Sequence, residues 1–236
     1  MKLTYVYHSG YVVEGKLCTI IIDYFKDSAD NYVQNSLVSF PGKLYVLSSH
    51  RHPDHFNKDV LKWKKNRPDT EYIFSKDILK KKFVSPENAS FLVKGDTWQD
   101  ENIYIKAFGS TDIGISFLIE TEGKKIFHAG DLNNWHWDEE STPEEIRSVE
   151  RHFLKELKTL ADETNHLDLA IFPVDCRLGK NYMRGAKQFV DTIQADLFAP
   201  MHFGETYKEA AAFKDYAEKN GRQFAAWTKT GESLFF

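Results

Sequence analysis

Short apolar runs separated by polar or glycine-containing turns dominate the first half of the chain and predict β-strands. Residues 4–7, 11–14 and 19–24 are rich in Tyr, Val and Ile, which favour extended backbone. Residues 30–35 are polar and indicate a turn. Further strands are expected at 43–47, 71–74, 90–93, 102–108, 114–120, 124–128, 167–174, 196–199, 223–227 and 233–235.

Apolar residues at helical spacing predict the helices, most clearly after residue 141. Thr142 is a good N-cap, Pro143 suits the first helical position, and Glu145 completes a capping box. The apolar positions that then recur at helical spacing are Ile146, Val149, Phe153, Leu157 and Leu160. Other helices are expected at 58–65, 77–82, 185–194 and 206–219.

The composition is that of an ordinary globular protein. The chain has 236 residues, 42% hydrophobic and 28% charged, so we expect one sizeable core and a single domain over residues 1–236. A net charge of −4 argues against a nucleic-acid surface, which is usually basic. No membrane span or signal peptide is predicted, and two isolated cysteines indicate a reducing, cytoplasmic location. The oligomeric state stays open.

A histidine cluster follows the strand expected at 43–47. Histidine is the commonest metal-binding side chain, because neutral imidazole offers a nitrogen lone pair near neutral pH. Residues of an extended segment that are two apart point to the same side, so alternating members of the cluster can converge. One cation cannot easily take four groups from six residues, whereas two neighbouring cations can. The cluster reads His50-Arg51-His52-Pro53-Asp54-His55.

This string resembles the signature of the metallo-β-lactamase superfamily. The resemblance implies a four-layer αββα sandwich: two mixed β-sheets face to face with helices outside. It also implies that His50 and His52 bind a first cation, and that Asp54 and His55 bind a second. Two later ligands are implied, and the chain supplies matches after short apolar runs: Asp131 as the bridging carboxylate and His202 as the last histidine.

The resemblance has one gap. The family usually has a third histidine for the first cation, but the matching stretch, residues 108–116, contains none. Asp112 is the possible replacement ligand, or the first position is poorer. The expected cofactors are therefore two divalent metal ions, with zinc favoured and manganese or iron suited to a more oxygen-rich set of ligands.

Several residues near the expected ligands are candidates for supporting roles. His8 and Asp23 match positions that lie under the metal site in related sequences, and we expect them to orient the ligands through hydrogen bonds. His128 points either to the site or into the core. The candidates for binding substrate, each open to a purely structural alternative, are Asn133, Trp135, His136, Arg177 and Tyr182.

The residues together favour hydrolysis. A metal-bound hydroxide would attack a small-molecule ester, lactone or phosphoester, and Asp54 would orient it or carry the proton to the leaving group. The resemblance is to the lactonase-like branch. The alternatives are a phosphodiesterase acting on nucleotides or nucleic acid, a degenerate metal-binding fold member without catalysis, and a redox protein. The redox branch usually has Glu at the position of His52 and carries a flavin domain.

Overall fold

The computed structural model describes all of residues 1–236, and its strands form two seven-stranded sheets. The first sheet has the order β14-β1-β2-β3-β4-β5-β6. Its strands β14, β1, β2 and β3 are antiparallel, whereas β3 to β6 run parallel. The bounds are β1 Lys2–Tyr7, β2 Gly10–Glu14, β3 Cys18–Ile22, β4 Lys43–Ser48, β5 Glu71–Ser75, β6 Ser90–Leu92 and β14 Ser233–Phe235.

The second sheet has the order β13-β12-β11-β10-β9-β8-β7 and repeats this plan. Its strands β7 to β10 are antiparallel, and β10 to β13 run parallel. The bounds are β7 Thr97–Gln99, β8 Tyr104–Phe108, β9 Ser116–Thr121, β10 Lys124–His128, β11 His166–Pro173, β12 Gln194–Met201 and β13 Gln223–Phe224.

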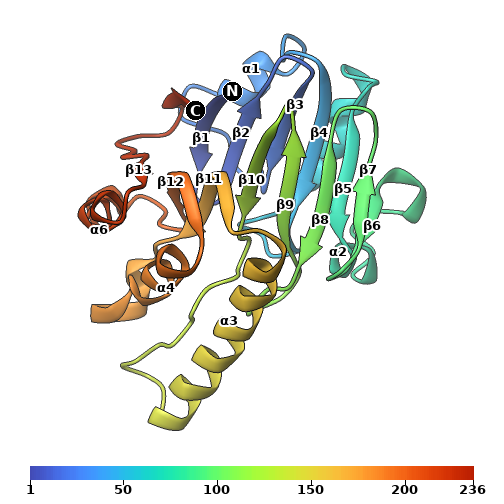
Figure 1. Cartoon of the computed structure of the whole chain (residues 1–236). Helices are drawn as coiled ribbons and strands as arrows, with labels where there is room; N and C mark the ends of the chain where they lie inside the picture. Colours follow the sequence, from blue (N-terminus) through green and yellow to red (C-terminus); the bar gives the residue numbers. More distant parts are fainter.

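The two sheets pack face to face with helices outside, as Figure 1 shows for β1–β4 behind β8–β10. Alternate residues of a strand point to opposite faces. In β4, Tyr45 and Leu47 therefore join the large core cluster, whereas Leu44 and Val46 join a smaller one. The smaller cluster lies under the helices of the first half. This arrangement is the predicted αββα sandwich.

The helices cover the outer faces and turn the chain between parallel strands. The α-helices are α1 Tyr32–Ser36, α2 Lys76–Lys80, α3 Pro143–Glu163, α4 Arg184–Thr192, α5 Tyr207–Ala211 and α6 Lys214–Lys219. The 3₁₀ helices are η1 Lys58–Lys65, η2 Pro86–Asn88 and η3 Cys176–Asn181. None of these helices combines the length and the apolar composition that crossing a bilayer requires.

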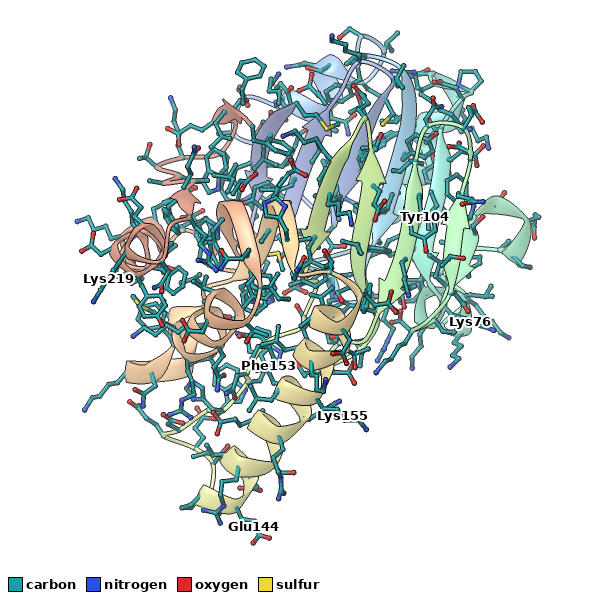
Figure 2. The ribbon with its side chains drawn as sticks, in the orientation of Figure 1. Lys76, Tyr104, Glu144, Phe153, Lys155 and Lys219 are labelled. Atoms are coloured by element: carbon teal, nitrogen blue, oxygen red, sulfur yellow. The ribbon has the colours of Figure 1, made fainter.

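The capping box of α3 forms as predicted. The Thr142 side chain accepts from the Glu145 N–H, and the Glu145 carboxylate accepts from the Thr142 N–H. Figure 2 shows Glu144 at the end of α3 that projects from the body of the molecule, and Phe153 and Lys155 farther along. Phe153 is fully buried, with its ring 6.3 Å from that of Phe172, and Lys155 is exposed. The second half of α3 therefore holds the helix to the sheet.

Some local predictions were wrong. The helix expected over 206–219 is two short helices, because the chain bends between Ala211 and Lys214. The stretch 30–35 contains most of α1, and 58–65 is a 3₁₀ helix capped by Asn57. Strand β7 was not predicted, because Trp98 is its only apolar residue and its two flanking residues are exposed.

Candidate metal centre

The candidate residues gather at one edge of the paired sheets. In the first sheet Asp23 follows β3 and His50 follows β4; in the second, Asp131, Asp175 and His202 follow β10, β11 and β12. Neighbouring parallel strands end at the same edge of a sheet, so their following residues lie together. Figure 1 shows one sheet in front of the other, with β8–β10 facing β1–β4. The topology therefore brings polar side chains from both halves of the sequence to one place.

Asp131 lies at the centre of this group. Its Oδ2 is 3.2 Å from His50 Nε2, and its Oδ1 is 3.2 Å from His55 Nε2 and 3.3 Å from His202 Nε2. The two carboxylate oxygens of Asp131 therefore face different histidines: Oδ2 faces His50, and Oδ1 faces His55 and His202. The chain segments around residues 50–55, 131 and 202 meet, as the sequence predicts.

One side of Asp131 carries the first candidate group. His50 Nε2 lies 3.0 Å from His52 Nδ1, and His52 Nδ1 lies 3.6 Å from Asp112 Oδ2. Donor atoms of His52, Asp112 and Asp131 all lie within 4.8 Å of one another. Asp112 therefore lies beside His52 and Asp131, in the group for which the sequence supplies no third histidine.

The other side carries the second candidate group. Donor atoms of Asp54, His55 and His202 lie within 4.8 Å of one another, and those of His50, His55 and Asp131 do so too. His8 joins the former set, with Nε2 3.5 Å from Asp54 Oδ2. His55 thus connects the two groups through Asp131.

Buried partners orient the imidazole rings. Asp23 Oδ2 is 2.7 Å from His55 Nδ1, and Asp175 Oδ2 is 2.9 Å from His202 Nδ1. A carboxylate that accepts from one ring nitrogen turns the other toward the site and raises its basicity. Asp23 is fully buried and Asp175 is 1% exposed. The sequence signal for Asp175 was present, because it follows a strand end as Asp23 and Asp131 do, but we did not predict this contact.

Ser49 extends the same support to the first group. Its hydroxyl donates to Asp23 Oδ2 at 2.6 Å and lies 3.0 Å from His50 Nδ1. Gly114, at φ 81°, lets the bend before β9 approach this segment, since an added Cβ would collide with the Ser49 carbonyl and His50 Cβ. The sequence offers no pattern that would predict either contact.

The electrostatics of the site follow from burial and close opposite charges. Burial opposes the charged form of His55, but the carboxylates of Asp131 and Asp23 outweigh it and raise the pKa of His55 to about 10. Burial likewise opposes ionisation of Asp131, yet the charge of His55 and the adjacent rings of His202 and His50 hold its pKa well below the usual range. The positive charge of the imidazole rings and the negative charge of the buried carboxylates therefore offset one another in this site.

Backbone strain is concentrated here. His8, Asp23 and His202 have φ values of 58°, 48° and 64°, in the left-handed region that non-glycine residues rarely adopt. Such conformations persist where the surroundings hold them, and they cluster at functional sites. All three residues belong to the candidate centre or touch it.

The donor atoms fit divalent cations. His55 Nε2 and Asp131 Oδ1 are buried and have no hydrogen-bond partner. Buried polar atoms without a partner are costly, and a bound ion is a common explanation. Imidazole and carboxylate are ligands of zinc, and the added carboxylate of Asp112 also suits manganese or iron.

A pocket of about 350 Å³ opens over these atoms. Its walls include Arg177, Trp135 and Trp137, with the two indole rings stacked at 6.5 Å between centroids. Trp135 Nε1 donates to the Asp131 carbonyl at 2.9 Å, which fixes this wall to the centre. Two of these walls, Trp135 and Arg177, were predicted from the sequence. The remaining lining residues are His52, Asp54, Thr111, Asp112, Asp131 and His202.

Three of the predicted substrate-binding residues do not line this pocket. Asn133 and His136 are fully buried; the Asn133 side chain accepts from the Asn134 N–H, and His136 Nε2 lies 3.1 Å from the Asn181 carbonyl. The Tyr182 hydroxyl donates to the Glu209 carbonyl at 2.9 Å. The structure therefore places these three side chains against other parts of the protein and outside the pocket lining.

His128 also belongs to the interior. It is fully buried, its Nε2 is 2.9 Å from the Ser9 carbonyl, and its Nδ1 accepts from the Gly130 N–H at 3.2 Å. Both ring nitrogens are used, so none is left for a cation. His128 nevertheless lies near the centre, with Nδ1 3.9 Å from Asp23 Oδ2.

Comparison with known proteins agrees with this architecture. The model of the beta-lactamase superfamily domain matches residues 2–147, more than half of the chain. The chain therefore belongs to the metallo-β-lactamase superfamily, as the histidine string indicated.

Solved structures share the fold over the whole chain. A metallo hydrolase from the archaeon Ignicoccus hospitalis has a TM-score of 0.70 at 19% identity, covering 99% of this chain and 97% of its own. YhfI from Bacillus subtilis, a metallo-β-lactamase fold protein, has 0.65 at 10%, covering 99% and 98%. The diiron β-hydroxylase CmlA from Streptomyces venezuelae has 0.68 at 14%, covering all of this chain but 54% of its own.

Proposed function

We propose that this protein is a dinuclear metal-dependent hydrolase of small molecules. The observation that carries the proposal is the position of Asp131, whose carboxylate lies within 3.2–3.3 Å of imidazole nitrogens of His50, His55 and His202. These residues come from three strand ends in two sheets. A purely structural role would not explain why Asp131 Oδ1 and His55 Nε2 are buried without partners.

The residues divide between two cations. His50, His52 and Asp112 would hold the first, Asp54, His55 and His202 the second, and Asp131 would bridge them. Two divalent cations, most simply zinc, supply an ionised water as nucleophile and stabilise negative charge that develops on a carbonyl or phosphoryl oxygen. The carboxylate of Asp112 leaves manganese or iron as an alternative at the first position.

Asp54 has the second role of a proton carrier. It lines the pocket, and its side chain is 41% exposed, so substrate and solvent reach it. Its Oδ2 lies toward His8, which leaves Oδ1 to accept the proton of the attacking water and pass it to the leaving group. Asp54→Asn would keep the shape and remove this function.

The pocket walls favour a small substrate with an anionic or flat group. A volume of about 350 Å³ is at the lower end of small-ligand pockets. Arg177 holds Asp175 through Nε and Nη2, and its side chain is 59% exposed, which leaves Nη1 for an anionic group. The Trp135 and Trp137 rings offer an apolar wall. An ester, a lactone or a phosphoester of this size is the proposed substrate.

Other functions remain as outcomes of one experiment. The lining carries a single cationic residue, Arg177, which gives little support to a nucleic-acid phosphodiesterase. The purified protein should be analysed for metal content and assayed against lactones, esters, phosphomonoesters and phosphodiesters. Two metals with turnover of a lactone, an ester or a phosphomonoester support the proposal, whereas turnover of phosphodiesters, nucleic acid included, would replace it.

The same assay separates the remaining alternatives. Bound metal without turnover of any class would mean a non-catalytic metal-binding protein. Two irons with consumption of dioxygen would mean a redox protein. The two cysteines are free, which suits a reducing compartment such as the cytoplasm, where we propose the protein acts.

A further inference from the structure

His8 lies against the second candidate group and has no sequence neighbour in it. It stands in the turn between β1 and β2, is 8% exposed, and has a buried Nε2 without a hydrogen-bond partner. Its donor atoms fall within 4.8 Å of those of Asp54, His55 and His202. Proximity alone would make His8 a further ligand of the second cation.

The hydrogen bonds of the other rings show how a ligand is prepared. A neutral imidazole carries its proton on one nitrogen and a lone pair on the other. A carboxylate can only accept, so Asp23 and Asp175, at 2.7 and 2.9 Å, place the protons of His55 and His202 on Nδ1. Arg177 Nη2 also lies 3.2 Å from His202 Nδ1, but it donates to Asp175 Oδ2 at 2.5 Å, so the Asp175 carboxylate remains the acceptor of the ring proton. Ser49 donates to Asp23 and must therefore accept from His50 Nδ1. In the neutral form of all three rings Nε2 therefore carries the lone pair, and this nitrogen faces Asp131.

His8 is arranged in the opposite way. The Gly204 N–H donates to His8 Nδ1 at 3.2 Å, so this nitrogen must carry the lone pair. The proton of the neutral ring is then on Nε2, the nitrogen that faces the site. His128 shows the same pattern, accepting from the Gly130 N–H at Nδ1 and donating from Nε2 to the Ser9 carbonyl.

We propose that His8 is a positioning residue that donates a hydrogen bond from Nε2 to Asp54 Oδ2 and does not bind the metal. This proposal rests on the proposed function only for the role of Asp54. The two atoms lie 3.5 Å apart. Hydrogen bonds of catalytic groups are often this long in ligand-free structures and shorten in the complex with substrate. The bond would hold Oδ2 in place and fix the orientation of the carboxylate, so that Oδ1 remains for the proton transfer proposed for Asp54.

The turn that carries His8 is built to keep this geometry. The His8 N–H donates to the Tyr5 hydroxyl at 2.9 Å, and the His8 carbonyl accepts from the His202 N–H at 3.0 Å. Both contacts hold the strained φ of His8. The second also couples the turn to the loop of His202, so His8 is aligned with the ligand it accompanies.

The proton position is tested directly by nitrogen-15 NMR of the histidine rings, with and without Zn²⁺. We expect His8 to carry its proton on Nε2 in both states, whereas His55 and His202 carry theirs on Nδ1 in the Zn²⁺-loaded protein. A His8 ring that has its proton on Nδ1 in the loaded protein, with Nε2 bare, would overturn the proposal. The metal-free spectrum tests the His8 tautomer even if the protein takes up no Zn²⁺.

A titration with Co²⁺ tests the same point by spectroscopy. The His8→Ala variant should keep the metal stoichiometry and the absorption bands of the wild type, with affinity or turnover reduced about 10- to 100-fold, as for other residues that orient ligands. His8→Gln, which restores an N–H near the position of Nε2, should recover most of the loss. Loss of one Co²⁺ equivalent in His8→Ala would show that His8 is a ligand.

Two control variants complete the titration. His55→Ala should lose metal and change the bands, because it removes a proposed ligand. His152→Ala, at a ring whose side chain is 53% exposed on α3, should behave as wild type. A wild-type protein that binds no Co²⁺ would contradict the proposed function, and the NMR result on metal-free protein would still decide the tautomer of His8.

Discussion

The two candidate cation positions share Asp131 but are built differently. At the first, His50 is fully buried, but the side chains of His52 and Asp112 are 38% and 48% exposed. At the second, the side chains of His55 and His202 are 0% and 6% exposed. Asp54 is the one exposed ligand of the second, with its side chain 41% exposed. The rings of the second position are also braced by buried carboxylates, whereas the brace of the first reaches only His50, through Ser49.

This difference in burial and bracing indicates which of the two cation positions the fold arranges for binding. Buried, braced ligands lose little freedom when a metal binds, whereas exposed side chains must first be ordered and are screened by solvent. We therefore expect the second position to hold its cation tightly and the first to exchange. Three sets of variants and one pH dependence test this contrast between the two positions.

Removing the shared carboxylate should erase the difference between the positions. Asp131→Ala takes a ligand from both cations and should lower turnover about 10³-fold, since such charge stabilisation supplies several kcal/mol. Metal analysis should show both equivalents reduced. Full metal content in this variant would mean that Asp131 does not bridge. The control is Asp196→Ala, at an exposed carboxylate on β12 that lies outside the candidate centre.

Cation binding at the second position should depend on pH, because a proton on His55 competes with the cation. The pKa of His55 is raised to about 10, so the metal-free ring holds a proton that a cation must displace. At pH values below that pKa, the apparent affinity for the cation rises about tenfold for each pH unit of increase, per proton displaced. The expected gain is about 100-fold between about pH 6 and about pH 8. Calorimetry in buffers of different ionisation enthalpy measures the release. Affinity that falls with rising pH would contradict this charge state.

The carboxylate braces should matter only at the second position. Asp175→Asn removes the charge that holds His202 Nδ1 and should weaken metal binding there by about 10- to 100-fold, leaving the first position unchanged. The matched control is Asp196→Asn, because Asp196 makes a 2.9 Å contact with His166 on the surface. Equal weakening in both variants would show that the effect is general electrostatics.

The smallest effect is expected at Asp112. Asp112→Ala should weaken the first cation by about tenfold, since the exposed carboxylate is partly screened. Asp112→His should restore binding and shift preference from Mn²⁺ toward Zn²⁺, because it replaces an oxygen donor with a nitrogen. Stepwise removal of metal by a chelator measures this. An unchanged first equivalent in Asp112→Ala would exclude Asp112 as a ligand.

Much of the fold could be predicted because its strands are short and strongly patterned. Strands β4, β10 and β11 were predicted to within two residues, and the α3 capping box is a local pattern that fixes its own hydrogen bonds. The break between α5 and α6 could not be predicted, because both helices have helical spacing and only the packing of Phe213 against β12 and β13 decides the bend.

The candidate site divides in the same way. His50, His52, Asp54 and His55 are close in sequence, so their spacing carries the signal. The substrate wall does not: Asn133, Trp135 and His136 are adjacent, yet only Trp135 lines the pocket. Which side of an irregular loop faces solvent depends on the hydrogen bonds that its backbone finds, and residue type does not encode them.

The sequence by itself determined the residue types, their order, and the strand ends that carry them, because metal ligands need particular donor atoms at particular spacings. Only the tertiary structure decided which histidines offer a lone pair to the centre. His8 and His55 are chemically identical side chains near the same carboxylates. A backbone N–H from Gly204 and a carboxylate from Asp23 place their protons on opposite nitrogens, and both partners come from distant strands.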